Sequence, residues 1–460
     1  MKEKKTSVGQ QPIRDARTLG VPKMLILGLQ HMFAMFGATV LVPILVQSYG
    51  LPLSIQTTLF FAGIGTLFFH VCTKMKVPAF LGSSFAFLGG FAAMGAMDSG
   101  MYAAMEPAEK LQYACGGIVV AGLLYVVLAA IIKAVGVHRV MHYLPPVVTG
   151  PIIILIGLNL APSAVSNASS CWWLALVSIA VIVVANIWGK GMIKIIPILL
   201  GVVIPYIVAL VFRMVDCSGL DVQGLFGGTT PLLGFQPFVT DFSGSVAKFD
   251  VSAILVMAPI AIASMMEHIG DMSAISATVG ENFIEDPGLH RTLIGDGIAT
   301  SLSAMFGGPA NTTYGENTGV LVLSRVHDPK VIRLAALYAV ILSFSPAFAY
   351  LVNTIPAAII GGVSFILYGM ISAIGVRNVV ENQVDFTNSR NLIIAAVILV
   401  SALGFNGVGG ISIPVGGVTI SLSGLAIAAI LGILLNAILP GNDYEFDSVN
   451  GGEDGLNMQV

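Results

Sequence analysis

Four acidic residues lie within apolar stretches of the second half of the chain. Glu267 and Asp271 occur in "MMEHIGDMSA", Asp296 in "IGDGIAT" and Glu316 in "NTTYGENTG". An acid inside an apolar segment is costly, and burial disfavours its charged form. These carboxyl groups are therefore candidates for binding and releasing a proton, or for accepting hydrogen bonds from a polar solute.

The spacing of the acids and two histidines refines this set. Glu267 and Asp271 are four residues apart and share one helix face, with His268 one step around the helix. His31, in "LQHMF", is a further candidate proton relay, although it serves equally well as a helix-to-helix hydrogen-bonding residue. For Asp271 and Asp296, a solvated or helix-capping position near the end of a span is an alternative interpretation. The candidate proton-coupling residues are Glu267, His31, His268, Asp271 and Asp296.

The elements that must position these residues are membrane helices. The chain has 460 residues, of which 56% are hydrophobic and only 10% charged, and its mean hydropathy is +0.91. Long apolar runs recur throughout, and about 20 apolar residues cross a bilayer as a helix. The net charge of -3 and the absence of a basic run argue against a nucleic-acid partner. The composition predicts an all-α polytopic membrane protein.

Hydropathy predicts fourteen transmembrane segments: 23–47, 55–73, 80–97, 112–132, 143–159, 171–188, 195–213, 251–271, 292–307, 310–324, 332–354, 356–374, 391–405 and 418–438. Residues 1–20 lack the apolar core and the cleavage site of a signal peptide, so we expect residues 1–22 to be a retained cytosolic tail. With that orientation, only three of the 21 Lys and Arg residues lie outside, namely Lys110, Arg213 and Lys248. Both termini are expected in the cytosol.

The long polar stretch 214–250 divides the segments into two sets of seven. Seven is odd, so equivalent halves insert with opposite orientations, as in the inverted repeats of many secondary transporters. "LPPVVTG" (144–150) opens the fifth segment and "IPAAIIG" (355–361) opens the twelfth. Likewise, "LQH" (29–31) in the first segment resembles "MEH" (266–268) in the eighth. These matches favour a 7+7 inverted repeat.

The third and tenth segments are interrupted by glycine, proline, serine and threonine, in "VPAFLGSSFAF" and "GGPANTTYGENTG". We expect short extended strands within Phe80 to Phe87 and Asn311 to Gly319, facing each other near the membrane midplane. Irregular backbone survives at that depth only where it is buried in protein or lines a cavity. Ordinary broken helices that fill protein interior are the alternative. The symmetric pair, one bearing Glu316, favours a substrate site.

A carboxyl group beside free backbone N–H groups offers an acceptor and donors at short range. That combination suits a small planar solute with alternating N–H and C=O groups, such as the edge of a nucleobase. An aromatic side chain, Phe85, Tyr314 or Tyr368, would lie against its face. Composition by itself fits an amino acid or an anion equally well.

Five motifs carry a resemblance to a known family: residues 29–43, "LQHMFAMFGATVLVP"; 77–87, "VPAFLGSSFAF"; 267–271, "EHIGD"; 286–291, "DPGLHR"; and 311–320, "NTTYGENTGV". Together they make the chain similar to the nucleobase/ascorbate transporter (nucleobase:cation symporter) family, in particular its bacterial uracil permeases. The resemblance extends from about residue 20 to 435. It implies a proton symporter of the cytoplasmic membrane that forms a homodimer through its gate domains, with the proton as coupling ion and no cofactor or metal.

The resemblance also implies a division into domains: cytosolic tails 1–22 and 439–460, a core domain 23–135 and 251–354, a gate domain 140–213 and 356–438, and an extracellular connection 214–250. Carried over by motif, the residues expected around the base are Glu267 and Glu316 as hydrogen-bonding carboxyls, Phe85 and Gly315 through their backbones, and Tyr314 and Tyr368 as packing aromatics.

Three residues decide between substrates. Asp271 stands where uracil permeases usually carry a second histidine, and Asp296 is similar to xanthine and urate transporters. Glu316 instead resembles uracil permeases, because purine carriers usually have glutamine there. Since Glu316 would touch the base, we expect uracil, with xanthine or urate as the alternative.

Other classes are less consistent with the chain. A membrane-embedded enzyme would need a nucleophile or metal cluster, and neither an HExxH nor a GxGD motif is present. A channel would place polar residues along continuous pore helices. An anion exchanger of the same fold class would not need a deep pair of glutamates. Cys72, Cys115, Cys171 and Cys217 show no metal-binding spacing, although a Cys171–Cys217 bridge stays open as an alternative.

Overall fold

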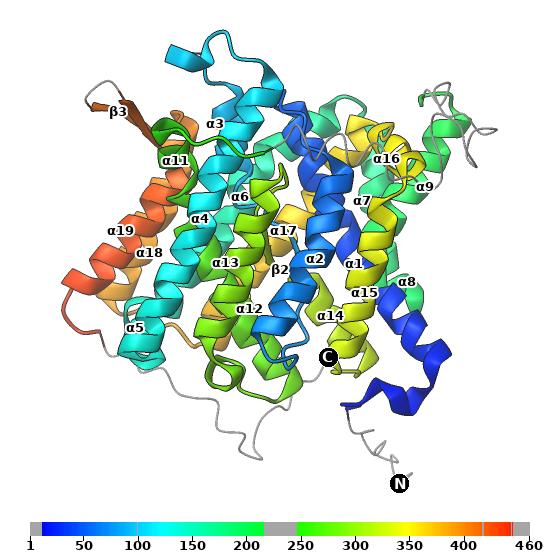
Figure 1. Ribbon diagram of the computed structural model, residues 1–460, viewed down its shortest axis with the longest axis horizontal. Helices are drawn as coiled ribbons and strands as arrows, with labels where there is room; N and C mark the ends of the chain where they lie inside the picture. The colour runs from blue at the N-terminus through cyan, green and yellow to red at the C-terminus, as the bar shows by residue number, and fades with distance from the viewer. Residues whose placement is uncertain (1–11, 99, 216–245, 416–417, 443, 445–460) are drawn as a thin grey trace.

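The structure is a computed structural model that describes residues 12–98, 100–215, 246–415, 418–442 and 444. Most of its helices run side by side along one direction, and the short strands β1 and β2 lie within the bundle (Figure 1). The elements of the first half are η1 (Ala16–Leu19), α1 (Val21–Ser48), α2 (Ile55–Cys72), β1 (Leu81–Ser83), α3 (Leu88–Gly95), η2 (Gly100–Tyr102), α4 (Pro107–Val135), α5 (Val137–Tyr143), α6 (Pro146–Ser169), α7 (Trp172–Ile187), α8 (Met192–Ile195) and α9 (Pro197–Val211).

The second half repeats this pattern of long helices and one short strand before adding a hairpin. Its elements are α11 (Val251–Met257), α12 (Ile260–Val279), η4 (Ile284–Gly288), α13 (Leu289–Met305), β2 (Asn311–Thr313), α14 (Gly315–Ser324), α15 (Pro329–Ser343), α16 (Pro346–Asn353), α17 (Ala357–Glu381), α18 (Ser389–Gly407), β3 (Ile411–Val415), β4 (Val418–Leu422) and α19 (Gly424–Ile438).

Within the described residues, seven helical spans are long and apolar enough to cross a membrane, and the bent pair α15 and α16, with an angle of 85°, makes up to eight. Helices α7, α9 and α19 are apolar but shorter. The chain is thus a multi-pass, mainly helical membrane protein. Each predicted segment overlaps one or more of these elements, whereas the predicted number of fourteen crossings stays a prediction.

Strands β1 and β2 pair with each other in antiparallel fashion, as the two interrupted segments predicted. Leu81 lies opposite Thr313 and Ser83 lies opposite Asn311. Both strands are fully buried and are only three residues long. The strand of segment ten takes up only the first residues of the predicted stretch Asn311 to Gly319, because α14 begins at Gly315 and places Glu316 in its first turn.

On each strand, one threonine hydroxyl forms hydrogen bonds with backbone groups of the outer edge. The Thr66 hydroxyl, on α2, accepts from the Leu81 amide at 2.8 Å and lies 3.2 Å from the Leu81 carbonyl. The Thr300 hydroxyl, on α13, bonds the amide and the carbonyl of Asn311, both at 3.1 Å. Unpaired backbone groups are costly away from water, so these hydroxyls let a two-stranded sheet exist inside the bundle.

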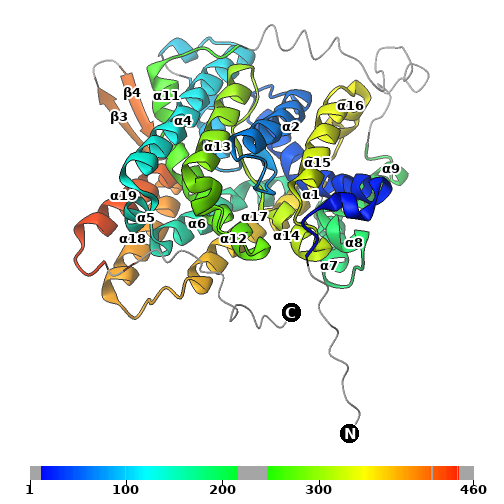
Figure 2. The same ribbon diagram turned by 60° about the horizontal axis from the view of Figure 1, so that its bottom comes forward.

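The helices associate in two groups. Helices α1, α2, α4, α13 and α15 contact one another extensively, as do α6, α7, α9, α17, α18 and α19. Figure 2 shows α18 and α19 beside the hairpin β3–β4, with α7, α8 and α9 at the opposite side of the molecule. The most extensive pairing in the second group joins α6 to α17.

Small residues explain how α6 and α17 come so close. A Cβ added to Gly157 would lie 2.1 Å from the Tyr368 carbonyl, and one added to Gly375 would lie 2.5 Å from the Ile154 amide. Small side chains let membrane helices pack backbone to backbone, where van der Waals contact replaces the hydrophobic effect. Both helices begin directly after a proline, Pro145 or Pro356, within the matching motifs of the two halves.

The prediction of a single helix over 418–438 is wrong. Residues 418–422 form β4, which pairs with β3 so that Ile411 lies opposite Leu422. Helix α19 has only 15 residues, a length of about 22 Å. The sequence "ISIPVGGVTISL" alternates β-branched and small residues around Gly-Gly, a hairpin pattern that its high hydropathy obscured.

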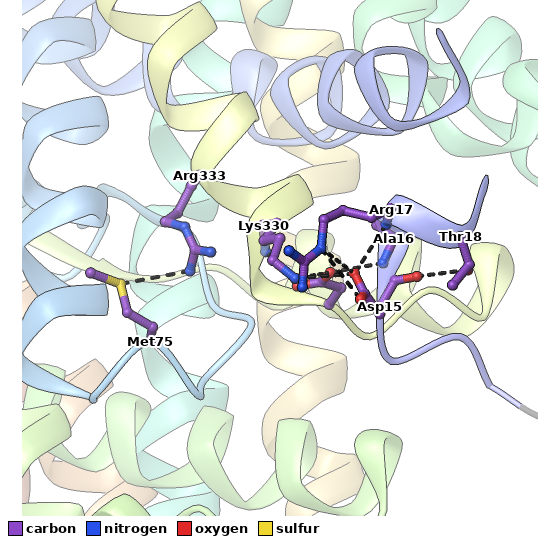
Figure 3. A network of polar contacts seen from close by, with 8 residues as sticks. Asp15, Ala16, Arg17, Thr18, Met75, Lys330 and Arg333 are labelled. Atoms are coloured by element: carbon purple, nitrogen blue, oxygen red, sulfur yellow. Dashed lines mark hydrogen bonds and ion pairs between the residues drawn. The ribbon is translucent and has the colours of Figure 1, made fainter. Parts of the chain in front are cut away.

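Residues 12–19, called here the N-terminal strap, attach to the turn between α14 and α15. The Ile13 amide donates to the Arg325 carbonyl at 2.9 Å, and the Ala16 amide donates to Asp328 Oδ2 at 2.8 Å. Figure 3 shows Asp15 surrounded by Arg17 and Lys330. The hydrogen bond from Arg17 lowers the pKa of Asp15. The strap therefore holds the end of the helix that carries Glu316.

Candidate functional site

A small cavity of about 20 Å³ lies where β2, α12 and α14 meet α6 and α17. Its lining residues are Phe85, Ile153, Glu267, Asp271, Thr312, Thr313, Tyr314, Gly315, Glu316, Ile371 and Ile374. Such a volume holds about one water molecule. Ligand pockets usually measure roughly 300 Å³ or more, so the surrounding helices must separate to admit a solute.

Three carboxyl groups face this cavity. Helix α12 presents Glu267 and Asp271, as their four-residue spacing predicted, and α14 presents Glu316 from its first turn. The Thr313 hydroxyl donates to Asp271 Oδ2 at 2.7 Å. Within the described part of the chain, Glu267 Oε2 is buried without a hydrogen-bond partner. A buried acceptor without a partner is unusual, and it is available to a donor group on a ligand.

The predicted aromatic residues divide into two sets. Phe85 and Tyr314 line the cavity, together with Gly315. The Tyr314 hydroxyl donates to the Ser83 carbonyl at 2.9 Å, which fixes its ring against β1. Tyr368 is buried behind Phe85, with ring centroids 5.9 Å apart and planes at 76°, and it is not among the lining residues. In this structure Tyr368 supports Phe85 and does not face the cavity.

His268 and Asp296 form a fully buried pair outside the cavity lining. His268 Nδ1 lies 2.9 Å from Asp296 Oδ2, and both side chains are 0% exposed. The Thr292 hydroxyl donates to the Leu289 carbonyl at 3.0 Å, so it must accept from His268 Nε2, also 3.0 Å away. The 2.9 Å separation is that of an ion pair, and neither His268 Nδ1 nor the Asp296 oxygens have a hydrogen-bond partner among the described residues. The interpretation of Asp296 as a solvated or capping residue is wrong, because its side chain is fully buried and faces His268 of α12.

His31 is also fully buried and lies outside the cavity lining. The Asn317 amide group donates to the His31 carbonyl at 3.0 Å and lies 3.3 Å from its Nδ1. Because Nδ1 accepts, the ring proton belongs on Nε2, which has no partner within the described residues. His31 therefore links α1 to the helix that carries Glu316.

Three isoleucines of the site were not predicted. Ile153 comes from α6, and Ile371 and Ile374 come from α17. No sequence signal distinguishes them from the many other apolar residues of these helices. Among the described residues, no group of three metal-ligating side chains exists. Cys217, and with it the alternative Cys171–Cys217 bridge, lies outside the described residues.

Comparison with known sequences decides the family. Residues 22–409 match the xanthine/uracil permeases, which are described as a permease family. The chain belongs to this family. It is therefore a membrane transport protein and not an enzyme.

Similar curated proteins cover nearly the whole chain. A uracil permease of Bacillus caldolyticus is 41% identical over 93% of this chain and 94% of its own length. A uracil permease of Bacillus subtilis is 39% identical over 96% and 97%, and a putative pyrimidine permease of Escherichia coli is 36% identical over 95% and 94%.

Solved structures resemble this one in fold only. The transmembrane domain of the cyanobacterial bicarbonate transporter BicA superposes with a TM-score of 0.56 at 15% identity and covers 93% of this chain and 99% of its own. The structure of SLC26A9 gives a TM-score of 0.61 at 13% identity and covers 92% and 65%. At these low identities, the similarity supports only a shared arrangement of the helices.

Proposed function

We propose that this protein is a proton-coupled symporter that imports a nucleobase, uracil, across the cytoplasmic membrane. The observation that carries the proposal is the pair Glu267 and Glu316, which face one cavity beside the β1–β2 junction. The ring N–H groups of uracil match carboxylate acceptors, and Phe85 and Tyr314 supply aromatic surfaces. The names of the similar uracil permeases support the same substrate.

The experiment is uptake of labelled uracil in cells that lack their own uracil permease. Unlabelled xanthine, urate and thymine serve as competitors, and an uncoupler removes the proton gradient. We expect uptake that uracil blocks and the uncoupler abolishes. Uptake of xanthine without any uptake of uracil would overturn the substrate, and uptake that resists the uncoupler would overturn the coupling.

Xanthine or urate is the second candidate substrate, and the position of Asp271 favours it. This third carboxyl group faces the cavity and accepts from Thr313. Xanthine and urate carry more ring N–H donors than uracil does. Bicarbonate is a poor candidate in spite of the fold that the chain shares with a bicarbonate transporter, because it lacks the ring N–H donors that the carboxyl groups around the cavity could accept.

The proton is proposed to reside on Glu267. Its unpaired Oε2 is buried in the cavity wall, where the charged form is disfavoured until a donor arrives. Glu267→Gln should still bind or exchange uracil but lose accumulation driven by a pH gradient. The exposed Glu285→Gln provides the control. Full accumulation by Glu267→Gln would remove this residue from the coupling mechanism, leaving His31, His268, Asp271 and Asp296 as candidates.

Transport is proposed to proceed by alternating access of a core domain, 23–135 and 251–354, against a gate domain, 140–213 and 356–438. The two groups of helix contacts support this division, and the cavity lies between them. The Thr66 and Thr300 caps on equivalent segments support a 7+7 inverted repeat of fourteen segments. We further propose that the termini 1–22 and 439–460 are cytosolic, that 214–250 is extracellular, and that the gate domains form a homodimer.

A further inference from the structure

A second and wider pocket of about 370 Å³ adjoins the carboxylate cavity. Three residues line both spaces, Gly315 and Glu316 on α14 and Ile374 on α17. These three residues, called here the wall, therefore lie between the two spaces. Glu316 can be reached from either side of this wall.

The outer end of the wider pocket reaches the protein surface near two cations, Lys194 and Arg377. Arg377 is 51% exposed and forms an ion pair with Glu381 at 2.7 Å. It lies one turn beyond Ile374 on α17, so this face of the helix leads from the surface to the wall. In the proposed orientation, both cations belong to the cytosolic side.

The wall depends on a close contact between Ile374 and a glycine. A Cβ added to Gly315 would lie 3.1 Å from Ile374 Cδ1, a distance tighter than ordinary contact. The Ile374 side chain thus packs directly on the α14 backbone. Helix α17 belongs to the second group, whereas α14 contacts α1 of the first group. Separating the two groups would therefore lift Ile374 from Gly315 and join the two spaces.

We propose that Ile374 is a specificity- and access-determining residue whose side chain closes the nucleobase cavity toward a route to the cytosol and limits the size of the accepted base. This inference rests on the proposed function. Glu316 forms the polar part of the same wall. The apolar part needs a side chain long enough to reach α14, which Ile374 provides.

The first test compares Ile374→Ala and Ile374→Val with the wild type. Uptake of labelled uracil is competed by uracils that carry an ethyl group at ring position 5, ring position 6 or N1. One methylene in an apolar pocket changes discrimination by roughly tenfold or more. We expect Ile374→Ala to improve competition by at least one of the three compounds, relative to uracil, by about tenfold. Ile374→Val should shift the same compound in the same direction by less.

Val376→Ala is the matched control, because Val376 is 50% exposed on the same helix and lines neither space. Equal selectivity in Ile374→Ala, Ile374→Val and Val376→Ala would overturn the inference. Should Ile374→Ala fail to fold, the shift or its absence in Ile374→Val decides. Failure of the wild type to take up uracil would instead reject the proposed function, so the two failures are distinguishable.

The second test adds a methyl group on the other side of the wall. Gly315→Ala would press on Ile374, whereas Gly369→Ala, on α17, has no atom within 4 Å of the new Cβ. We expect Gly315→Ala to weaken competition by all three ethyl compounds and by uracil, and Ile374→Ala in the same chain to restore uracil uptake. No restoration in the double variant would contradict direct contact between these residues.

Discussion

Strands β1 and β2 are supported in the same way, yet different side chains follow them. Thr66 caps the edge of β1 and Thr300 caps the edge of β2, each through one hydroxyl group. Three residues beyond the last strand residue, the first half has the buried Ala86 and the second half has Glu316. The symmetric backbone therefore makes the site possible, and the asymmetric side chains give it one chemistry.

A second difference concerns the ends of the two segments. Helix α14, after β2, is held by the N-terminal strap and by the bond from Asn317 to His31. Among the described residues, no terminal segment makes an equivalent backbone hydrogen bond to α3, the helix after β1. Helix α14, which carries Glu316, thus has an anchor to the N-terminal strap that α3 lacks. An anchored helix holds its carboxylate in a fixed position.

The largest expected effect comes from removing the asymmetric residue. Glu316→Ala makes the second half equivalent to the first at this position. A hydrogen bond to a charged group contributes about 1.5–3 kcal/mol, so uracil affinity should fall about 10- to 100-fold. Competition assays with labelled uracil measure this, and the exposed Glu285→Ala should behave as the wild type. Unchanged affinity would show that Glu316 does not touch the solute.

The next effect tests how closely the two strands must pack. A Cβ on Gly82 would lie 2.3 Å from the Tyr314 ring and 2.7 Å from Thr39 Oγ1. Overpacking of this kind costs about 1–3 kcal/mol, so Gly82→Ala should lower the thermal unfolding temperature of the purified protein. Gly89→Ala, in α3, meets nothing within 4 Å and serves as control. Equal unfolding temperatures for both variants would contradict the packing described.

A smaller effect tests the symmetry itself. Thr66→Val and Thr300→Val each keep side-chain volume while removing the hydroxyl group that bonds a strand edge. Each should cost about 1 kcal/mol, and the two costs should be similar because the hydrogen bonds are similar. Chemical denaturation in detergent measures both. A loss of unfolding free energy in only one of the two variants would show that the hydroxyl groups do not support β1 and β2 equally.

The smallest effect concerns the strap. The pKa of Asp15 is lowered by Arg17, so the contribution of its carboxylate is present above the unfolded pKa, about 3.9, and disappears as pH falls through the lower folded value. Protease cleavage within residues 12–19 should therefore increase only at strongly acidic pH. The Asp15→Asn variant should be cleaved faster than the wild type at neutral pH, and its cleavage should lack this dependence on pH. Identical cleavage profiles for the variant and the wild type would show that Asp15 does not hold the strap in place.

Much of the site could be predicted because polar residues are conspicuous in an apolar chain. Glu267 and Asp271 share a face, and the two interrupted segments pair as strands. The sequence did not show where the second strand ends and α14 begins, because small and polar residues suit both the strand and the first turn of the helix. The hairpin β3–β4 was missed because hydropathy measures how apolar a segment is and not its backbone conformation.

The sequence by itself determined which segments are apolar, where helices are interrupted and which few residues can carry charge. Local chemistry fixes these features, since each depends on neighbours along the chain. Only the tertiary structure decided which charges meet. It separated Glu267 from the adjacent His268, sealed Asp296 against that histidine, and brought Ile374 of α17 onto Gly315 of α14. Such contacts depend on how helices distant in sequence pack, and an isoleucine that packs against a binding site looks like any other isoleucine in the chain.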